Sequence, residues 1–454
     1  MSGYTRHPAS YKDPSGFVFQ TNGKIYRQVN KVYAENYDHF IGSGLYEVLT
    51  GKHYLLSHTE IKDNITSGEE WYTTLLPEQL SFTSYPYEWC FEQMKDAALL
   101  TLEIVKIAVG KGMILKDATP FNIQFHKGNP VFIDTLSFEK YDASLPWIAY
   151  RQFCETFLFP LWLAHYHKTS FQHLLGVYPG GIPVEIAAKL LPGKSGLNPG
   201  VWLHVRLQNK LNKSKLSNKS AHHFTKNKLL NLVSHLESII QKLDNSNKTN
   251  WSSYYTESIN SPEYLHEKEK IISELLSDVH VNKVLDLGAN EGQFSLLAAE
   301  KGVDVVAIDN DEQCINNFYK KVKKLNIAGI LPLCIDIINP SPASGFDNRE
   351  RTAFSERIQP DIVMALALIH HLVIGKNIPL SMVAEYLSRL APQLIIEFVP
   401  KEDEKTQLLL QNKKDIYTEY SKEGFESCFG LYFNFNTAKQ VGDTGRFIYM
   451  MNKK

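Results

Sequence analysis

Side chains able to do acid–base and hydrogen-bonding chemistry lie at the ends of short apolar runs in the second half of this chain. Asp309 and Asp336 each follow such a run, Glu397 lies near the end of another, and His370-His371 follows a fourth. A carboxylate accepts hydrogen bonds from sugar hydroxyls and amino groups. A histidine with an ordinary pKa of about 6.5 can take a proton from a hydroxyl or an amine. These residues therefore suit a site that binds a sugar-containing ligand and moves a proton.

The elements that must position these side chains begin in the stretch Val284–Asp311. It predicts a strand, a turn, a helix and a second strand at Val284–Leu287, Gly288–Gly292, Phe294–Lys301 and Val303–Ile308. Crossover units of this kind place their ligand sites at the carboxyl ends of the strands, and glycines let the turn bend tightly near a ligand. Asp309 stands 23 positions after Asp286, where such a unit places a carboxylate for ribose hydroxyls. The spacing G-A-N-E-G differs from the dinucleotide fingerprint G-x-G-x-x-G, so a pyrophosphate clamp is not expected.

Further apolar runs continue the alternation of strands and helices. A helix is expected at Ser261–Ser277, and later strands are expected at Ile330–Ile335, Asp361–Ala367, Leu394–Phe398, Gly430–Asn436 and Arg446–Met451. Continuous apolar strands favour a parallel sheet covered on both faces. The last two strands predict an antiparallel hairpin. The expected fold class is therefore α/β, doubly wound and Rossmann-like, with a mostly parallel seven-stranded sheet.

The sequence VLDLGANEG resembles motif I of class I S-adenosylmethionine-dependent methyltransferases, an acid followed by G-x-G-x-G. Asp286, Gly288, Asn290 and Gly292 fall on this pattern, and Asn290 replaces the middle glycine. Asparagine tolerates unusual backbone angles better than most residues. Together with LALIHHL, IIEFVPK and the upstream segment described below, the layout is similar to bacterial two-part methyltransferases of a nodulation-protein-like type.

This resemblance implies S-adenosyl-L-methionine as the cofactor. It implies that Asp336 binds the adenine amino group and that Ile337 packs on the adenine face. The cofactor-binding residues expected from it are Asp286, Gly288, Ala289, Asn290, Gly292, Asp309, Asn310, Asp336, Ile337 and Ala367.

The resemblance also places His370-His371 beside the expected methyl group. His371 is the preferred catalytic base and His370 the second, although packing or helix capping is the other interpretation. Glu397 is the next candidate base or substrate contact. Tyr254 or Tyr255 would line the pocket or serve packing alone. Arg349, Arg351 and Arg357 form either a lid or anion-reading loop or a charged surface.

In the first half, Asp117 and Asn122 are spaced D-x-x-x-x-N, and Asp134 closes the run PVFID. This arrangement resembles kinase-like and aminoglycoside-phosphotransferase-like folds, in which the first acid orients a hydroxyl and the other two residues hold magnesium on phosphates. The segment departs from that pattern, because no glycine-rich loop precedes it and only Lys24 and Lys31 are loose candidates for the strand lysine. The alternative is a helix, loop and hairpin whose polar side chains satisfy loop backbone groups. We expect an α+β domain, kinase-like under the first interpretation, with no metal site beyond these candidates.

At 454 residues the chain is long enough for two or three domains. We expect an N-terminal substrate-recognition domain over 1–243, a polar linker over 244–250 and the methyltransferase domain over 251–454. The net charge of −1 indicates no global attraction to nucleic acid or anionic membrane. Only the basic strip Asn209–Lys228 suggests nucleic acid or a phosphorylated substrate, and a solvated helix surface or a mobile connection is the commoner explanation of such a strip.

Five scattered cysteines argue against a disulfide framework or a thiolate zinc site. No apolar run reaches the roughly 18 residues that a membrane helix needs, and a cytoplasmic protein is expected.

The expected function is methyl transfer to a hydroxyl or amine of a small molecule, sugar or lipid. The alternatives are an ATP-dependent phosphotransferase with an appended methyltransferase-like domain, or a pseudoenzyme that binds the cofactor without turnover.

Overall fold

A computed structural model describes residues 3–210, 225–246, 262–411 and 413–454. The chain forms two compact units. The first comprises Met1–Asn247 together with Ala343–Thr352, and the second comprises Lys248–Pro342 and Ala353–Lys454. Most of the basic strip and the end of the expected linker lie outside the described residues, as do Tyr254 and Tyr255.

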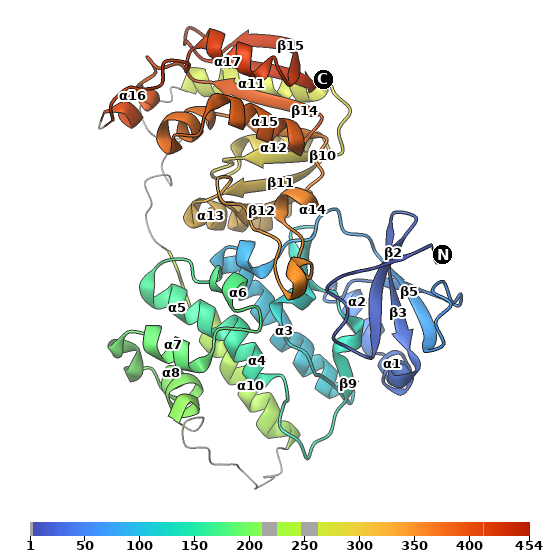
Figure 1. Cartoon of the computed structure of the whole chain (residues 1–454). Helices are drawn as coiled ribbons and strands as arrows, with labels where there is room; N and C mark the ends of the chain where they lie inside the picture. The colour runs from blue at the N-terminus through green and yellow to red at the C-terminus, as the bar shows by residue number, and fades with distance from the viewer. Residues whose placement is uncertain (1–2, 211–224, 247–261, 412) are drawn as a thin grey trace. The chain divides into compact units, whose positions relative to one another are not determined.

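The first unit begins with a five-stranded antiparallel sheet of order β1-β2-β3-β5-β4 (Figure 1). Its strands are Thr5–Arg6, Gly16–Thr21, Lys24–Asn30, His58–Ile61 and Trp71–Pro77, numbered β1 to β5. Strand β2 pairs with β3 across Asn22-Gly23, a dipeptide that favours tight hairpin turns, and both turn residues have positive φ angles of 49° and 73°. Two helices, α1 (Ala34–Gly42) and α2 (Leu45–Gly51), connect β3 to β4.

A long helix, α3 (Phe91–Gly110), leads into two short strand pairs. Strand β6 (Met113–Leu115) pairs with β9 (Phe138–Lys140), and β7 (Ile123–His126) pairs with β8 (Asn129–Phe132). Helices complete the unit: α4 (Tyr150–Phe153), the π-helical turn η5 (Cys154–Leu158), α5 (Phe159–His167), α6 (Leu174–Val177), α7 (Val184–Leu190), α8 (Pro199–Val201), η7 (Trp202–Leu207) and α10 (Lys226–Gln241).

Residues from far along the sequence also belong to the first unit. Within the segment Ala343–Thr352, Glu350 accepts hydrogen bonds from Lys12 at 2.8 Å and from Tyr11 at 3.3 Å. The guanidinium of Arg351 lies 4.0 Å from the ring centroid of Phe121. The expectation of a lid loop or a charged surface is therefore wrong for Arg351, which is buried in the first unit.

The second unit contains a seven-stranded sheet of order β12-β11-β10-β13-β14-β16-β15. The five strands β10 to β14 run parallel, and β16 and β15 close the sheet as an antiparallel hairpin. These strands are Lys283–Leu287, Asp304–Asp309, Ile330–Cys334, Ile362–Ala365, Gln393–Phe398, Phe433–Gln440 and Phe447–Lys453, numbered β10 to β16. The fold class predicted for the second half is confirmed.

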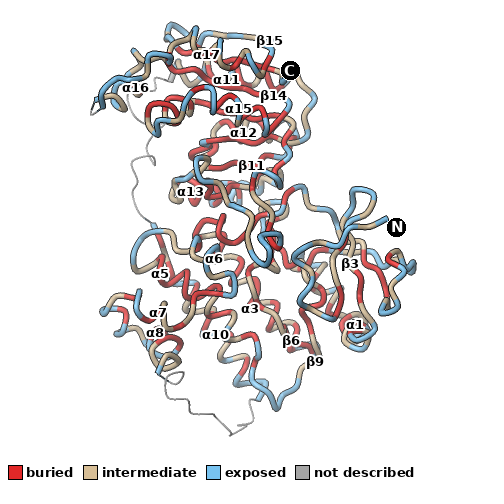
Figure 2. Tube along the Cα trace, in the orientation of Figure 1, coloured by how far each residue is buried: buried red, intermediate tan, exposed pale blue. Residues whose placement is uncertain are grey.

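Helices cover both faces of this sheet because its strands are apolar on both sides. On one face, α11 (Pro262–Ser277), α12 (Gln293–Glu300) and α13 (Glu312–Lys324) share a core with β10, β11 and β13. On the other face, α15 (Leu380–Leu390) packs on α17 (Lys422–Phe429), whose Phe425 contacts Tyr449 of β16. The strands are mostly buried along their length (Figure 2).

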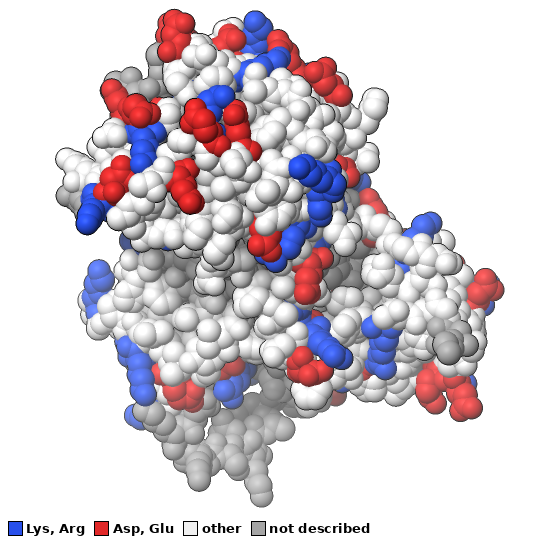
Figure 3. Space-filling view, turned by 45° about the horizontal axis from the view of Figure 1, so that its top comes forward, with Lys and Arg blue, Asp and Glu red and all other residues white. Residues whose placement is uncertain are grey.

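On the face drawn in Figure 3, Lys and Arg side chains are intermixed with Asp and Glu side chains. This agrees with the net charge of −1. In the described part of the chain, no helix combines the length and apolar character needed to cross a membrane.

Candidate active site

A pocket of about 390 Å³ lies at the carboxyl ends of β10 to β13, where parallel sheets of this type bind ligands. It brings together nine of the ten residues expected to bind a cofactor: Asp286, Gly288, Ala289, Asn290, Asp309, Asn310, Asp336, Ile337 and Ala367. Gly292 is the exception, because it does not line the pocket. The pocket is open, and side chains of the protein do not fill it.

The turn after β10 has the backbone that its sequence predicts. Gly288, Asn290 and Gly292 have φ angles of 72°, 50° and 77°, all in the left-handed region. Asn290 thus takes the place of a glycine in the pattern without losing its backbone shape. The backbone amides of Gly288 and Ala289 donate to the carbonyl of Ile308 on β11, which fixes the turn beside the second strand.

Asp286 and Asp309 are the two acids of the pocket that flank this turn. The Asp286 carboxylate is buried and accepts a hydrogen bond from the Ser295 hydroxyl at 2.6 Å. Burial raises its pKa to about 6. Asp309 accepts hydrogen bonds from the backbone amides of Asn290 and Asp311, both at 2.9 Å, and burial raises its pKa as well. The turn and the second acid are therefore held together before any ligand binds.

The wall beyond β12 combines one acid with apolar side chains. Asp336 accepts a hydrogen bond from the backbone amide of Ile338 at 3.1 Å, and Ile335, Ile337 and Ile338 line the pocket around it. Ala367, at the end of β13, has a positive φ of 50°. A non-glycine residue in this region is strained, and such strain is concentrated at functional sites.

The two histidines occupy different environments. His371 opens the π-helical turn η10 (His371–Gly375) and lines the pocket, whereas His370 is fully buried and does not. Neither ring nitrogen of His370 has a hydrogen-bond partner among the residues that the structure describes. Burial and then the charge of Lys405 lower the pKa of His371 to about 4. The geometry thus favours His371 over His370 for contact with an acceptor.

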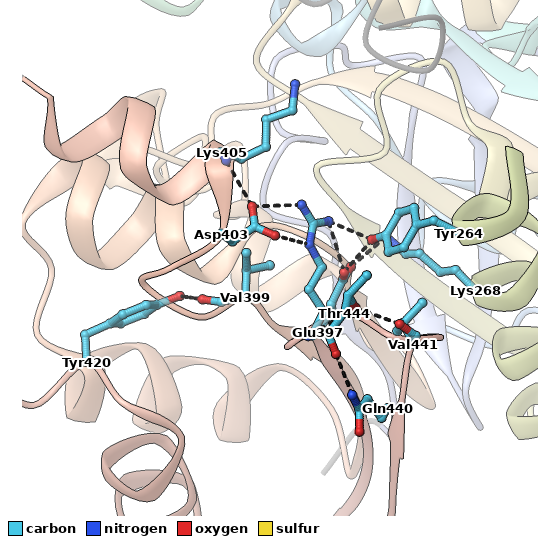
Figure 4. Close-up of polar contacts among 11 residues, drawn as sticks. Tyr264, Lys268, Glu397, Val399, Asp403, Lys405, Tyr420, Gln440, Val441 and Thr444 are labelled. Carbon is cyan, nitrogen blue, oxygen red and sulfur yellow. Dashed lines mark hydrogen bonds and ion pairs between the residues drawn. The ribbon is translucent and has the colours of Figure 1, made fainter. Parts of the chain in front are cut away.

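Glu397 also lies away from the pocket, in a buried network of charges (Figure 4). Its carboxylate lies 2.6 Å from Nζ of Lys268 and accepts a hydrogen bond from the Tyr264 hydroxyl at 2.7 Å. Arg446 contacts the same carboxylate at 3.4 Å and Asp403 through two hydrogen bonds of 2.7 and 3.0 Å. Burial alone would raise the pKa of Glu397, but the Lys268 and Arg446 charges hold it below its usual range. A carboxylate tied to two cations is poorly placed to accept a proton from substrate.

Several pocket residues were missed by sequence reasoning. Tyr264 and Lys268 reach the pocket from α11, Lys376 from the end of η10, and Leu409 from α16 (Glu404–Leu410). One signal was present for Lys268, because it stands on the apolar stripe of α11 at helical spacing from Ile271, Ile272 and Leu275. A lysine on a buried stripe indicates a partner or a ligand.

The candidate residues of the first unit are also brought together. Asp117 and Asn122 lie on the loop between β6 and β7, and Asp134 lies between β8 and β9. Asp134 forms an ion pair with Arg27 of β3 and accepts a hydrogen bond from Ser137 at 2.5 Å. Burial, followed by the nearby charge of Asp134, raises the pKa of Asp117. Across the residues that can be described, no group of three or more His, Cys, Asp or Glu side chains is arranged to hold a metal ion.

The order of the sheet, its antiparallel closing hairpin and the acids at its carboxyl edge define the second unit as a class I S-adenosylmethionine-dependent methyltransferase fold. S-adenosyl-L-methionine is the cofactor of this class, and the pocket fits it, with a carboxylate after the second strand and an apolar wall after the third. Residues 252–354 match the tellurite resistance protein TehB family.

The chain belongs to the family of the nodulation protein NoeA. It is 30% identical to NoeA of Rhizobium meliloti (strain 1021) over 435 residues, which cover 93% of this chain and 91% of that protein. The relationship therefore includes both units and not only the methyltransferase fold.

Two solved structures are similar to a part of the chain. The PH0226 protein from Pyrococcus horikoshii OT3 has 22% identity and a TM-score of 0.33, and covers 44% of this chain and 99% of its own. The N-methyltransferase NodS from Bradyrhizobium japonicum WM9 has 12% identity and a TM-score of 0.32, covering 43% and 98%. Scores at this level do not define the activity of the chain.

Proposed function

We propose that this protein transfers a methyl group from S-adenosyl-L-methionine to a hydroxyl or amine of a small molecule, sugar or lipid. The observation that carries the proposal is the single pocket shared by the motif turn, Asp309, Asp336 and His371. An acid placed for ribose and an apolar wall suited to a base would hold a nucleoside there. The leaving sulfur needs no proton, so the residues have mainly to align the reacting atoms.

In this proposal Asp309 binds the ribose hydroxyls, Asp336 the adenine amino group, and Ile337 the face of the base. When bound, the cofactor supplies a methyl carbon whose bond to sulfur breaks, with the electron pair staying on sulfur, as the bond to the acceptor forms. His371 takes the acceptor's proton. Its low pKa keeps it unprotonated at neutral pH, which makes it able to accept a proton.

Calorimetric titration of S-adenosylhomocysteine into the wild-type protein and Asp309→Asn tests this assignment. We expect the substitution to weaken binding by about 10-fold or more, since it removes a charge from the hydrogen bonds to the sugar. Asp304→Asn, at the exposed start of the same strand, is the matched control and should bind like the wild type. Equal affinity of wild type and Asp309→Asn would contradict the ribose assignment.

For the first unit we propose substrate recognition on a kinase-like fold. Supporting this, the β6–β9 and β7–β8 pairs flank Asp117, Asn122 and Asp134. Arg27 on the central strand β3 contacts Asp134, and so supplies the strand cation for which Lys24 and Lys31 were the sequence candidates. Phosphotransfer is the second candidate function, favoured by the same convergence of residues.

Magnesium-dependent binding of an ATP analogue separates these two roles. If the first unit transfers phosphate, the wild type binds the analogue only with magnesium and Asp134→Ala loses that binding. Asp142→Ala, an exposed acid on the loop after β9, is the control. Absence of binding by the wild type would leave recognition as the role of this unit.

A further inference from the structure

One buried cation lines the pocket from outside the strand–turn–helix motif. Lys268, on α11, has a side chain that is only 5% exposed. Its Nζ lies 4.6 Å from the ring centroid of Phe294 and 5.8 Å from that of Tyr264, and both rings also line the pocket. A buried ammonium normally has a strong structural or ligand-binding reason to be there, because removing it from water is costly.

The ion pair with Glu397 uses only part of the bonding capacity of this ammonium. An ammonium has three N–H donors, and the described residues offer Nζ one carboxylate, Glu397, and two aromatic faces. Lys268 also lines the pocket, so an acceptor bound there can approach its ammonium. A nearly buried cation thus lies beside the space that a ligand would occupy.

Charge in the surrounding network is balanced before any ligand enters. Lys268 and Arg446 are matched by Glu397 and Asp403, which are linked through the contacts drawn in Figure 4. Tyr264 bridges the network, donating to Glu397 and accepting from Arg446 at 2.6 Å. This arrangement holds the Lys268 side chain against the pocket wall, because Oε2 of Glu397 contacts Lys268 while Oε1 is held by Tyr264 and Arg446.

The pocket also holds the opposite charge close to Lys268. Asp286 is buried and lines the same pocket; burial raises its pKa, and the Lys268 charge opposes part of that rise. A fixed cation beside a fixed carboxylate matches a zwitterion, a group with one carboxylate and one ammonium. The amino-acid end of the cofactor is such a group, and its carboxylate is the only anionic part of the molecule.

We infer that Lys268 binds the carboxylate of the cofactor's amino-acid end and that Glu397 is the positioning residue that holds Lys268 in place. The inference rests on the proposed function, since it assigns a further contact to the same ligand. It also gives Glu397 a role different from the base or substrate contact expected from its place on β14. Lys376, the other lysine that lines the pocket, is exposed at the end of η10, whereas Lys268 is buried and paired with Glu397.

Two ligands that differ only in this carboxylate test the inference: S-adenosylhomocysteine and its decarboxylated analogue. Calorimetric titrations would be carried out on the full chain. The wild type should prefer the ligand with the carboxylate. Lys268→Met should lose about 10- to 100-fold in affinity for S-adenosylhomocysteine, the range expected for a hydrogen bond between charged groups, and should bind the analogue as the wild type does.

Three further variants complete the test. Lys270→Met, an exposed lysine on the same helix, should leave both affinities unchanged. Lys268→Arg should retain part of the preference for the carboxylate, because the charge remains. Glu397→Gln should reduce the preference without weakening the analogue, a change that a purely structural role would not produce. Lys268→Met leaves the buried Glu397 carboxylate without its lysine partner. If that variant does not fold, the double variant Lys268→Met/Glu397→Gln, which also removes this negative charge, is used in its place.

The outcomes distinguish the role of Lys268 from the binding of the cofactor itself. Equal losses for both ligands in Lys268→Met, or no loss for either, would overturn the role of Lys268. Failure of the wild type to bind either adenosyl ligand would instead overturn the proposed function. Loss confined to the ligand with the carboxylate supports both.

Discussion

Gly292 lies directly against the ring of Phe318, a buried residue of α13, so that a Cβ on the glycine would overlap the ring. The motif glycine that does not line the pocket thus serves the packing of α13 beneath the turn. Gly288, in contrast, lies on the pocket wall, where the atom nearest to an added Cβ would be Cδ1 of the Leu368 side chain at 3.3 Å. The motif therefore needs glycine at position 292 for packing against α13 and at position 288 to keep the pocket wall free of a side chain.

Replacing Gly292 with alanine should therefore destabilise the second unit strongly. The overlap with Phe318 adds about 1–3 kcal/mol of overpacking to the cost of a positive φ. Gly302→Ala is a matched control, since Gly302 has a φ of 79° and open space around its missing side chain. Urea denaturation should show a larger loss for Gly292→Ala than for Gly302→Ala, and equal losses would mean that the ring moves aside.

Asp286→Asn should stabilise the ligand-free protein at neutral pH. A pKa raised from 3.8 to about 6 means that ionised Asp286 costs about 3 kcal/mol in the folded state. The contribution of a raised pKa is present below the unfolded value and is lost as pH rises through the folded value. The gain of the variant should therefore grow between pH 4 and pH 6 and level off above it. Unfolding free energies measured from pH 4 to pH 8 check this, with exposed Asp278→Asn as the control.

The same Asp286→Asn substitution should weaken the binding of S-adenosylhomocysteine, because the carboxylate is held in the pocket for a ligand. A variant that is both more stable and a better binder would contradict this account. Gain of stability with loss of binding is the usual relation at a strained site.

His371→Asn should reduce methyl transfer by about 10²- to 10⁴-fold, the usual contribution of a general base. Transfer of labelled methyl from the cofactor into fractionated extract is the measurement, and exposed His280→Asn is the control. Because the pKa of His371 is lowered to about 4, the acidic limb of kcat/KM should fall near pH 4 rather than near the ordinary histidine value. A limb unchanged in His371→Asn would assign the proton to another group.

Arg351→Ala should destabilise the first unit by about 1–3 kcal/mol. The substitution removes a desolvated cation from the face of Phe121 and from its ion pair with Glu350 at 3.3 Å. Arg349→Ala, whose side chain is 78% exposed, is the control two positions away. Thermal unfolding should show a lower Tm for Arg351→Ala alone. Similar decreases in Tm for both variants would mean that the loss of a positive charge, and not the loss of the buried contacts, causes the effect.

The local sequence pattern was sufficient to predict the backbone of the motif turn and of the strands and helix beside it. The left-handed angle of Asn290 and the hairpin at Asn22-Gly23 follow from residue types within a few positions of each other. Patterns of this kind depend on backbone sterics and on the periodicity of apolar residues.

Contacts between residues far apart in the sequence could not be predicted from the sequence alone. Tyr264 and Glu397 are 133 positions apart along the chain, and nothing near either residue indicates that they meet. Glu397 consequently resembled a free acid at a strand end, although its charge is fully compensated in the structure. The burial of Arg351 was missed for the same reason, because its partner Phe121 lies in the other half of the sequence.

The assignment of Ala343–Thr352 to the first unit has a practical result for dissecting this protein. A fragment that stopped at Asn247 would lack Glu350 and Arg351, leaving Lys12 without its carboxylate and Phe121 uncovered. A fragment that began at Lys248 would carry these two residues without the surface that buries them. Neither fragment would keep these contacts. A domain exchanged between homologues would therefore have to include Met1–Asn247 together with Ala343–Thr352.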